Sequence, residues 1–353
     1  MTCLHDTLTV IDGLIISKWS RGVFADMRNG GLTAANCTCS IWEGFVDTMR
    51  NIAQWKRWFA DNADLITPVH TPADIRRAKV ESRTGIILSF QNTSALEDQI
   101  GYISLFKELG VGIMQITYNT QNLAGAGCYE RRDTGLSGFG HEVVAEMNRV
   151  GVLCDLSHVG AVTSRDVILA SKQPVAYTHI LPVALKAHPR NKSDEEIRFI
   201  ADHGGFVGVT MFPPFLAKGN ESTVEDYVAA IDYVIRSAGE DNVGIGTDFT
   251  QDQDDAFFEY LCHDKGYGWR VTGPLGEVVN PAGMRTIGDF PNLTAAMEHA
   301  GWPEAKIRKV TTSARRTITA ARPCGAGSPT PFASSRTRRP PGRSYSIKKD
   351  RRR

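Results

Sequence analysis

The chain of 353 residues lacks the features that mark exported or membrane proteins. No run of 18 consecutive apolar residues occurs, which excludes an ordinary membrane-spanning helix. The N-terminal residues MTCLHDTLTVIDGLII have no basic segment before their short apolar run, so we do not expect a secretory signal. The remaining composition, with 42% hydrophobic and 22% charged residues, is typical of a globular protein with a sizeable core.

The seven cysteines lack any pattern and are odd in number. Such a set indicates reduced thiols rather than a disulfide framework, and we therefore predict a cytoplasmic protein. Cys37 and Cys39 have no second Cys or His pair at the spacing of a zinc site, which favours a structural role for both.

Charge is distributed very unevenly along the chain. Residues 311–353 carry twelve Lys and Arg but one acidic residue, whereas residues 1–310 carry 28 basic and 38 acidic residues. The C-terminal segment lacks apolar periodicity and is rich in Arg, Pro, Ser and Gly, so we expect a basic, disordered tail. One interpretation is an arm for nucleic acid or an acidic membrane. We favour the other, translation outside the native reading frame, and predict neither partner.

Short β-branched segments alternate with longer amphipathic ones over residues 1–310. Near-continuous apolar runs such as GVLCDL are typical of strands buried on both faces of a parallel sheet. The predicted strands are Leu8–Ile11, Leu32–Cys37, Gly85–Phe90, Gly112–Thr117, Val152–Leu156, Pro174–Thr178, Gly205–Thr210 and Asn242–Gly246, with Leu65–Val69 as a weaker ninth.

Helical periodicity occupies the intervals between these strands. Phe139–Val150 and Val224–Ala238 each place apolar residues on one face, and Gly110, Gly151 and Gly204 follow predicted helices directly before a strand. About eight strand–helix units in one chain predict a single-domain, TIM-like (β/α)8 barrel over residues 1–310.

Active sites of such barrels form where the strands end. Polar residues at predicted strand ends include Asp12, Gln91, Tyr118–Asn119, His158, His179 and Asp248. A single histidine in such a place is more often structural than a ligand. Two on successive strands, with Asp248 on a later one, favour a metal site, since imidazole is the commonest zinc ligand.

Several sequence blocks then resemble the membrane (renal-type) dipeptidase family of metallopeptidases. They occur in the family's order and are DLSHVG (155–160), PVAYTH (174–179), HPRNKSDEE (188–196), GGFVGVTMF (204–212) and VGIGTDF (243–249). The resemblance runs from about Ile11 to Val310. It implies a (β/α) barrel with a two-zinc site that cleaves dipeptides and related amides.

The resemblance assigns roles to individual residues. His158 and His179 match two ligands of one metal, Arg190 matches the residue that holds the substrate carboxylate, and Asp248 matches the acid near the catalytic water and the substrate amine. Without this resemblance, Arg190 would be interpreted as a solvated surface charge and Asp248 as a helix N-cap.

The sequence also departs from the family pattern. The first-strand signature Asp-Gly-His-x-Asp, which supplies two ligands of the other zinc, is replaced by residues 12–16, DGLII. The metal-bridging glutamate aligns with Gln91, a neutral and poor bridge, and a substrate-contacting histidine aligns with Tyr118. We therefore expect one divalent metal, with zinc as the first choice, bound by His158 and His179 with Gln91 as the candidate third ligand, while Tyr118 donates to the substrate.

Two hypotheses of different classes follow. The first is a one-metal hydrolase of a small amide, such as a dipeptide or an N-substituted amino acid, with Asp248 handling protons. The second is a degenerate peptidase that binds a small metabolite without catalysis, because Leu14 and Ile16 make the barrel mouth more apolar. The resemblance also favours a homodimer.

Overall fold

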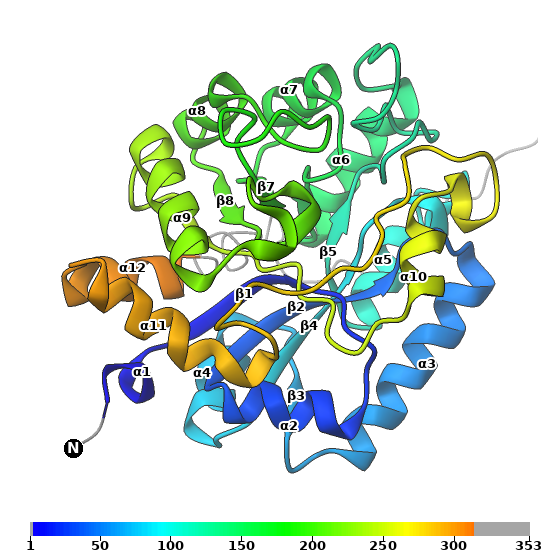
Figure 1. Cartoon of the computed structure of the whole chain (residues 1–353). Coiled ribbons are helices and arrows are strands. Elements are labelled where there is room, and N and C mark those ends of the chain that lie inside the picture. The colour runs from blue at the N-terminus through cyan, green and yellow to red at the C-terminus, as the bar shows by residue number, and fades with distance from the viewer. Residues whose placement is uncertain (1–2, 314–353) are drawn as a thin grey trace, which may run out of the picture.

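The structure, a computed structural model, describes residues 3–313. Helices surround a nearly closed barrel of parallel strands (Figure 1). Neighbouring strands follow the order β1-β2-β4-β5-β6-β7-β8-β9, and β3 pairs with β4 beside this path. The predicted TIM-like barrel is confirmed.

The strands have the following bounds: β1 Val10–Ile15, β2 Leu32–Ser40, β3 Ile66–Pro68, β4 Thr84–Phe90, β5 Val111–Gln115, β6 Leu153–Asp155, β7 Ala176–Ile180, β8 Phe206–Val209 and β9 Val243–Ile245. Each overlaps a predicted strand, including the weaker ninth. Almost every strand residue is buried, as expected for a sheet that has side chains inside the barrel and helices outside it.

The α-helices are α1 Leu4–Thr7, α2 Arg21–Asn29, α3 Phe45–Asp61, α4 Pro72–Val80, α5 Tyr102–Glu108, α6 Gly138–Val150, α7 Ala161–Ala170, α8 Asp194–Asp202, α9 Val224–Ala238, α10 Asp255–Leu261, α11 Phe290–His299 and α12 Glu304–Thr312. Short 3-10 turns lie at Ser94–Leu96 (η1), Pro213–Phe215 (η2), Gly219–Glu221 (η3), Asp264–Gly266 (η4) and Ile287–Asp289 (η5). No helix within residues 3–313 is both long and apolar enough to cross a membrane.

Two predicted strand ends are displaced in the structure. β1 starts two residues later than predicted and continues to Ile15, so Asp12 lies inside the strand and is fully buried. β7 extends to Ile180 and contains His179. The apolar runs in the sequence stop before Asp12 and His179. Backbone pairing with the neighbouring strands continues past these points, so each strand is longer than its apolar run indicates.

The backbone of β7 at Thr178 is in close contact with three other segments of the barrel. Three glycines, Gly13, Gly208 and Gly246, approach its carbonyl oxygen so closely that an added Cβ would lie 1.9–2.5 Å from it. Only residues without a side chain fit there, so the glycines allow β1, β8 and β9 to close around Thr178.

The barrel closes between β9 and β1. The backbone N–H of Asp248 donates to Leu14 O at 2.9 Å, and that of Ile16 donates to Phe249 O at 2.9 Å. The buried carboxylate of Asp12 reinforces this seam, because it accepts from both the backbone N–H and the hydroxyl of Thr247.

The C-terminal helix α12 continues past the predicted boundary at residue 310. It runs to Thr312, and the hydroxyl of Ser313 donates to Val243 O in β9 at 2.5 Å. The rest of the predicted basic tail lies outside the described residues.

Gly246→Ala should destabilise the barrel, because its Cβ would lie 1.9 Å from the backbone carbonyl oxygen of Thr178. Forced overpacking of this kind costs about 1–3 kcal/mol or more, which denaturant unfolding would measure. Gly138→Ala is the matched control: a Cβ there meets nothing within 4 Å, so helix propensity should leave stability equal or slightly higher. Equal stability of both variants would contradict the close approach.

Candidate active site

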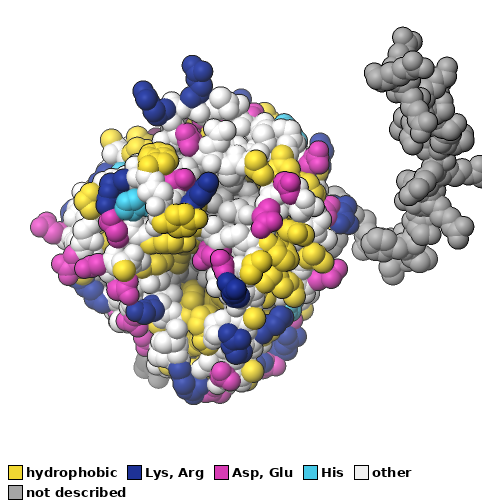
Figure 2. All heavy atoms as spheres, turned by 90° about the vertical axis from the view of Figure 1, so that its right-hand side faces the viewer, with side chains coloured by type: hydrophobic (Ala, Val, Ile, Leu, Met, Phe, Trp, Pro, Cys, Tyr) yellow, Lys and Arg dark blue, Asp and Glu magenta, His cyan; other side chains and the backbone are white. Residues whose placement is uncertain are grey.

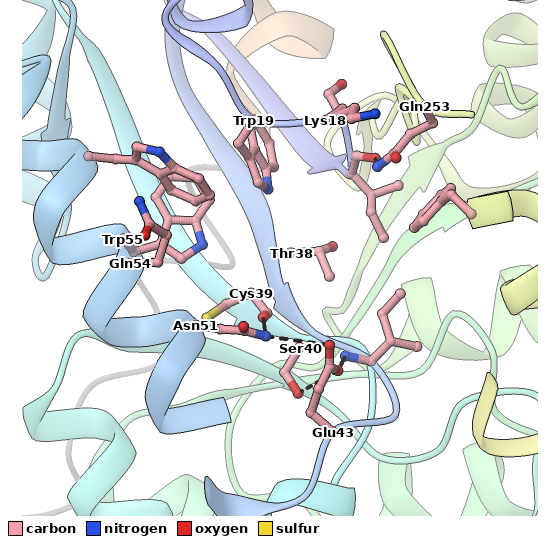
Figure 3. A pocket seen from close by; sticks show the side chains of 15 residues that line it. Lys18, Trp19, Thr38, Cys39, Ser40, Glu43, Asn51, Gln54, Trp55 and Gln253 are labelled. Atoms are coloured by element: carbon pink, nitrogen blue, oxygen red, sulfur yellow. Dashed lines mark hydrogen bonds between the residues drawn. The ribbon is translucent and has the colours of Figure 1, made fainter. Parts of the chain in front are cut away.

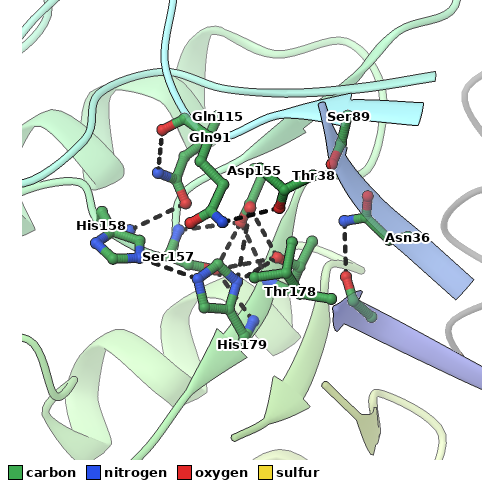
Figure 4. A network of polar contacts seen from close by, with 12 residues as sticks. Asn36, Thr38, Ser89, Gln91, Gln115, Asp155, Ser157, His158, Thr178 and His179 are labelled. Carbon is green, nitrogen blue, oxygen red and sulfur yellow. Dashed lines mark hydrogen bonds and ion pairs between the residues drawn. The ribbon is translucent and has the colours of Figure 1, made fainter. Parts of the chain in front are cut away.

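Two buried histidines face each other at the centre of the barrel mouth. His158 follows β6, His179 lies in β7, and their Nε2 atoms are 3.0 Å apart (Figure 4). The structure thus brings together the two residues predicted to bind one metal.

The hydrogen-bond network determines where the imidazole protons lie. Thr178 has one hydroxyl hydrogen, which it donates to Asp155 Oδ2 at 2.7 Å, so its oxygen accepts from Nδ1 of His179 at 2.7 Å. Nδ1 of His158 lies 2.7 Å from Asn119 Oδ1, an oxygen that can only accept. Both histidines therefore carry hydrogen on Nδ1, and two Nε2 lone pairs face each other.

This arrangement fits a metal ion. Burial, together with the positive charge of Arg190, holds the pKa of both His158 and His179 well below the ordinary value, so both rings are neutral. Two lone pairs 3.0 Å apart repel each other unless a cation or a shared proton lies between them. A single zinc ion about 2.0–2.1 Å from each nitrogen satisfies that separation.

Gln91, which the sequence analysis offered as a further ligand, is buried as well. It lines the same cavity as His158, and its Nε2 donates to Thr38 Oγ1 at 2.8 Å, which leaves the amide oxygen as the potential ligand. Among residues 3–313 no group of three or more His, Cys, Asp and Glu side chains is arranged to hold a metal. Any ion here must therefore complete its shell with amide oxygen, water or substrate.

The other half of the mouth is apolar. Ile16, Ile41, Tyr118 and Leu261 form a buried cluster there, and Leu14 is fully buried. The Tyr118 ring stacks on His158 with centroids 4.2 Å apart. Aliphatic side chains supply no ligand, so positions 14 and 16 offer nothing to a second cation.

A cavity of about 40 Å³ lies between these two halves. His158, Gln91, Tyr118 and Asp248 all line it, so four of the six predicted site residues share one small space. His179 lies behind His158, and Arg190 contacts the backbone of both strand ends.

Asp248 has the properties of a proton acceptor near neutral pH. It is buried and adopts the left-handed conformation at φ 58°, which turns it into the mouth directly after β9. Burial raises the pKa of its carboxyl to about 7; Arg190 opposes this rise and Asp155 adds to it. No helix begins at Asp248, so the structure gives it no N-cap role.

Arg190 is buried, in contrast to an ordinary surface arginine. Its Nη1 donates to Ser157 O at 2.5 Å and its Nη2 to His179 O at 2.8 Å, which ties the two histidine-bearing strand ends together. The Nε–H of the guanidinium is a buried donor without a hydrogen-bond partner among the described residues.

A second cavity of about 270 Å³ lies behind Ile16, which contributes to the walls of both cavities. Trp19, Trp55 and Trp58 are among its lining residues, and Glu43 lies across the cavity from Trp19 and Trp55 (Figure 3). On this face of the molecule, the side of α3 and α10, hydrophobic side chains gather around a recess (Figure 2). Ile16 thus separates the candidate metal site from a larger, aromatic pocket.

Sequence reasoning missed Asp155 and gave Thr178 and Asn119 no role. Asp155 accepts four hydrogen bonds from Ser157 and Thr178, and Thr178 and Asn119 contact the Nδ1 atoms of the two histidines. A signal was present, because Asp155 opens the DLSH motif that contains His158.

Comparison with known proteins places this site in a family. The model of the membrane dipeptidase family of peptidases matches residues 23–269. An amidohydrolase from Pseudomonas aeruginosa of known structure is 61% identical, with a TM-score of 0.89 over 90% of this chain and 98% of that one. A metallopeptidase from Rhodobacter sphaeroides, solved with a phosphinate mimic of the dipeptide L-Ala-D-Ala, is 20% identical, with a TM-score of 0.74 over 89% and 99%.

The chain belongs to the membrane dipeptidase family, as its sequence motifs predicted. It is a dipeptidase-like, metal-dependent hydrolase of peptide or amide bonds.

We predict at most one tightly bound divalent metal per chain, because the first strand offers aliphatic side chains where the family has ligands. His158→Ala or His179→Ala should abolish metal binding, since a site with two imidazoles cannot spare one. Metal analysis after dialysis would measure both effects. Two equivalents retained by the unaltered protein would contradict the prediction.

Proposed function

We propose that the chain hydrolyses a small amide, either a dipeptide or an N-substituted amino acid, with one zinc ion held by His158 and His179. The observation that carries this proposal is the pair of Nε2 lone pairs 3.0 Å apart. Gln91 Oε1 is the proposed third protein ligand.

A bound divalent ion would polarise the scissile carbonyl and lower the pKa of water. Asp248 would accept the proton from the attacking water and return it to the leaving amine. Its pKa of about 7 suits this exchange, because a general base works best when its pKa is near the working pH.

Arg190 and Tyr118 would orient the substrate. The unpartnered Nε of Arg190 and the adjacent Nη would receive the substrate carboxylate, a geometry that suits a forked guanidinium. Burial holds the pKa of the Tyr118 phenol well above its ordinary value, so this group stays protonated and can donate a hydrogen bond.

A binding protein without catalysis is the second candidate. The apolar cluster around Ile16 favours it, since an apolar wall beside the histidines suits retention of a small metabolite. Turnover with added metal separates the two candidates. We further propose a homodimer in the cytoplasm; the six described cysteines are free thiols, which supports that compartment.

Asp248→Asn should lower kcat about 10²- to 10⁴-fold, the usual contribution of a positioned acid or base. Because the base must be ionised, kcat/KM of the unaltered enzyme should rise with pH up to about 7 and then level off. Asparagine tolerates the left-handed backbone, which makes it a matched replacement. A full rate in this variant would remove Asp248 from the reaction.

The same variant has a stability signature that does not depend on turnover. The folded pKa of Asp248 is about 7 and lies above the ordinary 3.8, so the free energy of unfolding should fall as pH rises from about 4 through 7. Asp248→Asn should lack this part of the fall, which denaturant unfolding at several pH values would measure. Parallel stability profiles would contradict the raised pKa.

Arg190→Ala should raise KM for carboxylate-bearing amides about 10- to 150-fold, the value of a charge-assisted contact of roughly 1.5–3 kcal/mol. Arg190→Lys should restore little of this loss, because an ammonium group cannot reproduce the fork. Steady-state kinetics on a dipeptide panel, with circular dichroism as the control for folding, would test both. Unchanged kinetics in Arg190→Ala would exclude it from substrate binding.

A further inference from the structure

Asp155, the last residue of β6, lies between the two strand ends that carry the histidines. Its Oδ1 accepts from the backbone N–H of Ser157 at 3.0 Å, the Ser157 hydroxyl at 2.6 Å and the backbone N–H of Thr178 at 3.1 Å. Its Oδ2 accepts from the Thr178 hydroxyl at 2.7 Å. The carboxylate is buried, so all of these donors come from the protein.

The contact with Thr178 has a directional consequence for His179. Burial raises the pKa of the Asp155 carboxyl, and its hydrogen bonds from Ser157 and Thr178 oppose that rise. In the ionised form this carboxylate can only accept, so the hydroxyl hydrogen of Thr178 points at Asp155. The oxygen of that hydroxyl is then free to accept, and Nδ1 of His179 lies 2.7 Å from it. The Nδ1 atom of His179 must therefore carry the hydrogen, and Nε2 keeps its lone pair.

We propose that Asp155 is a positioning residue that acts through the Thr178 hydroxyl to fix His179 as the Nδ1–H tautomer, with Nε2 presented as a metal ligand. Asp155 lies too far from His179 for a direct hydrogen bond, 3.9 Å between Oδ2 and Nδ1, so the hydroxyl is a necessary link. The catalytic consequence rests on the proposed function; the tautomer assignment does not.

The rest of the barrel restricts Thr178 to this role. Its carbonyl is surrounded by Gly13, Gly208 and Gly246, and its backbone N–H is bound to Asp155. With both backbone groups constrained, the hydroxyl has little freedom to turn away. The Ser157 hydroxyl also donates to Asp155 and accepts from the backbone N–H of His179 at 3.1 Å, which fixes the histidine backbone as well.

An internal comparison shows which part of this arrangement is specific to His179. Asp12 bonds to Thr247 in the same way, and Thr247 also precedes a predicted site residue, Asp248. No imidazole follows Thr247, so Asp12 stabilises the seam between β9 and β1 without setting a tautomer. Asp12→Asn is therefore a matched control: it removes a buried carboxylate bound to threonine but leaves the His179 relay intact.

The experiment is a long-range ¹H–¹⁵N correlation spectrum of histidine-labelled, metal-free full chain, combined with a zinc titration. In the unaltered protein and in Asp12→Asn we expect His179 to carry hydrogen on Nδ1. In Asp155→Asn the amide can donate to Thr178, whose hydroxyl then turns to Nδ1 of His179 and shifts the ring to the Nε2–H form. Zinc affinity should fall about 10- to 100-fold, the usual effect of losing a partner that orients a ligand.

Two further variants guard against a failure of Asp155→Asn to fold. Thr178→Val removes the link and should give mixed tautomers with the same loss of affinity, whereas Thr178→Ser keeps the hydroxyl and should restore both readouts. An unchanged Nδ1–H tautomer in either Asp155→Asn or Thr178→Val would overturn the proposal, even if affinity fell, because a purely structural role predicts that result. The tautomer is read without metal or substrate, so a chain that never hydrolyses an amide would contradict the proposed function and leave this test unaffected.

Discussion

The close packing of Gly13, Gly208 and Gly246 against the Thr178 carbonyl of β7 is the constraint on which the candidate site depends. Three glycines on β1, β8 and β9 allow those strands to approach its carbonyl, and the next residue in the chain is His179. Because the backbone is enclosed at this point, the imidazole emerges in one direction, toward His158. A site built on a rigid strand holds its geometry better than one built on a loop.

Buried charges organise the layer around this strand. Asp155 collects hydrogen-bond donors from Ser157 and Thr178, while Arg190 donates to the carbonyls of Ser157 and His179. The same two strand ends are thus held from one side by an anion and from the other by a cation. Burial, together with this positive charge, keeps both imidazoles neutral, which is the state that a metal ligand requires.

Much of this could be predicted from the sequence, because apolar runs in a parallel barrel specify strands and the ends of neighbouring strands meet. That logic placed His158 and His179 together, and the family resemblance identified Leu14 and Ile16 as aliphatic residues in place of ligands. It could not find the roles of Asp155 or Asn119, since hydrogen-bond partners depend on how strands are staggered. It also placed Asp12 and His179 after strands that in fact contain them, because hydrophobicity stops before the backbone pairing does.

The small cavity has a consequence for the kinetics of substrate capture. About 40 Å³ holds a few water molecules and is far below the roughly 300–1,000 Å³ of clefts that enclose organic ligands. Thr272 and Leu275, in the long connection between α10 and α11, form part of its wall. For a ligand of dipeptide size to reach His158, the walls of this cavity would have to move apart, and such a step would keep the association rate constant of that ligand below the diffusion limit.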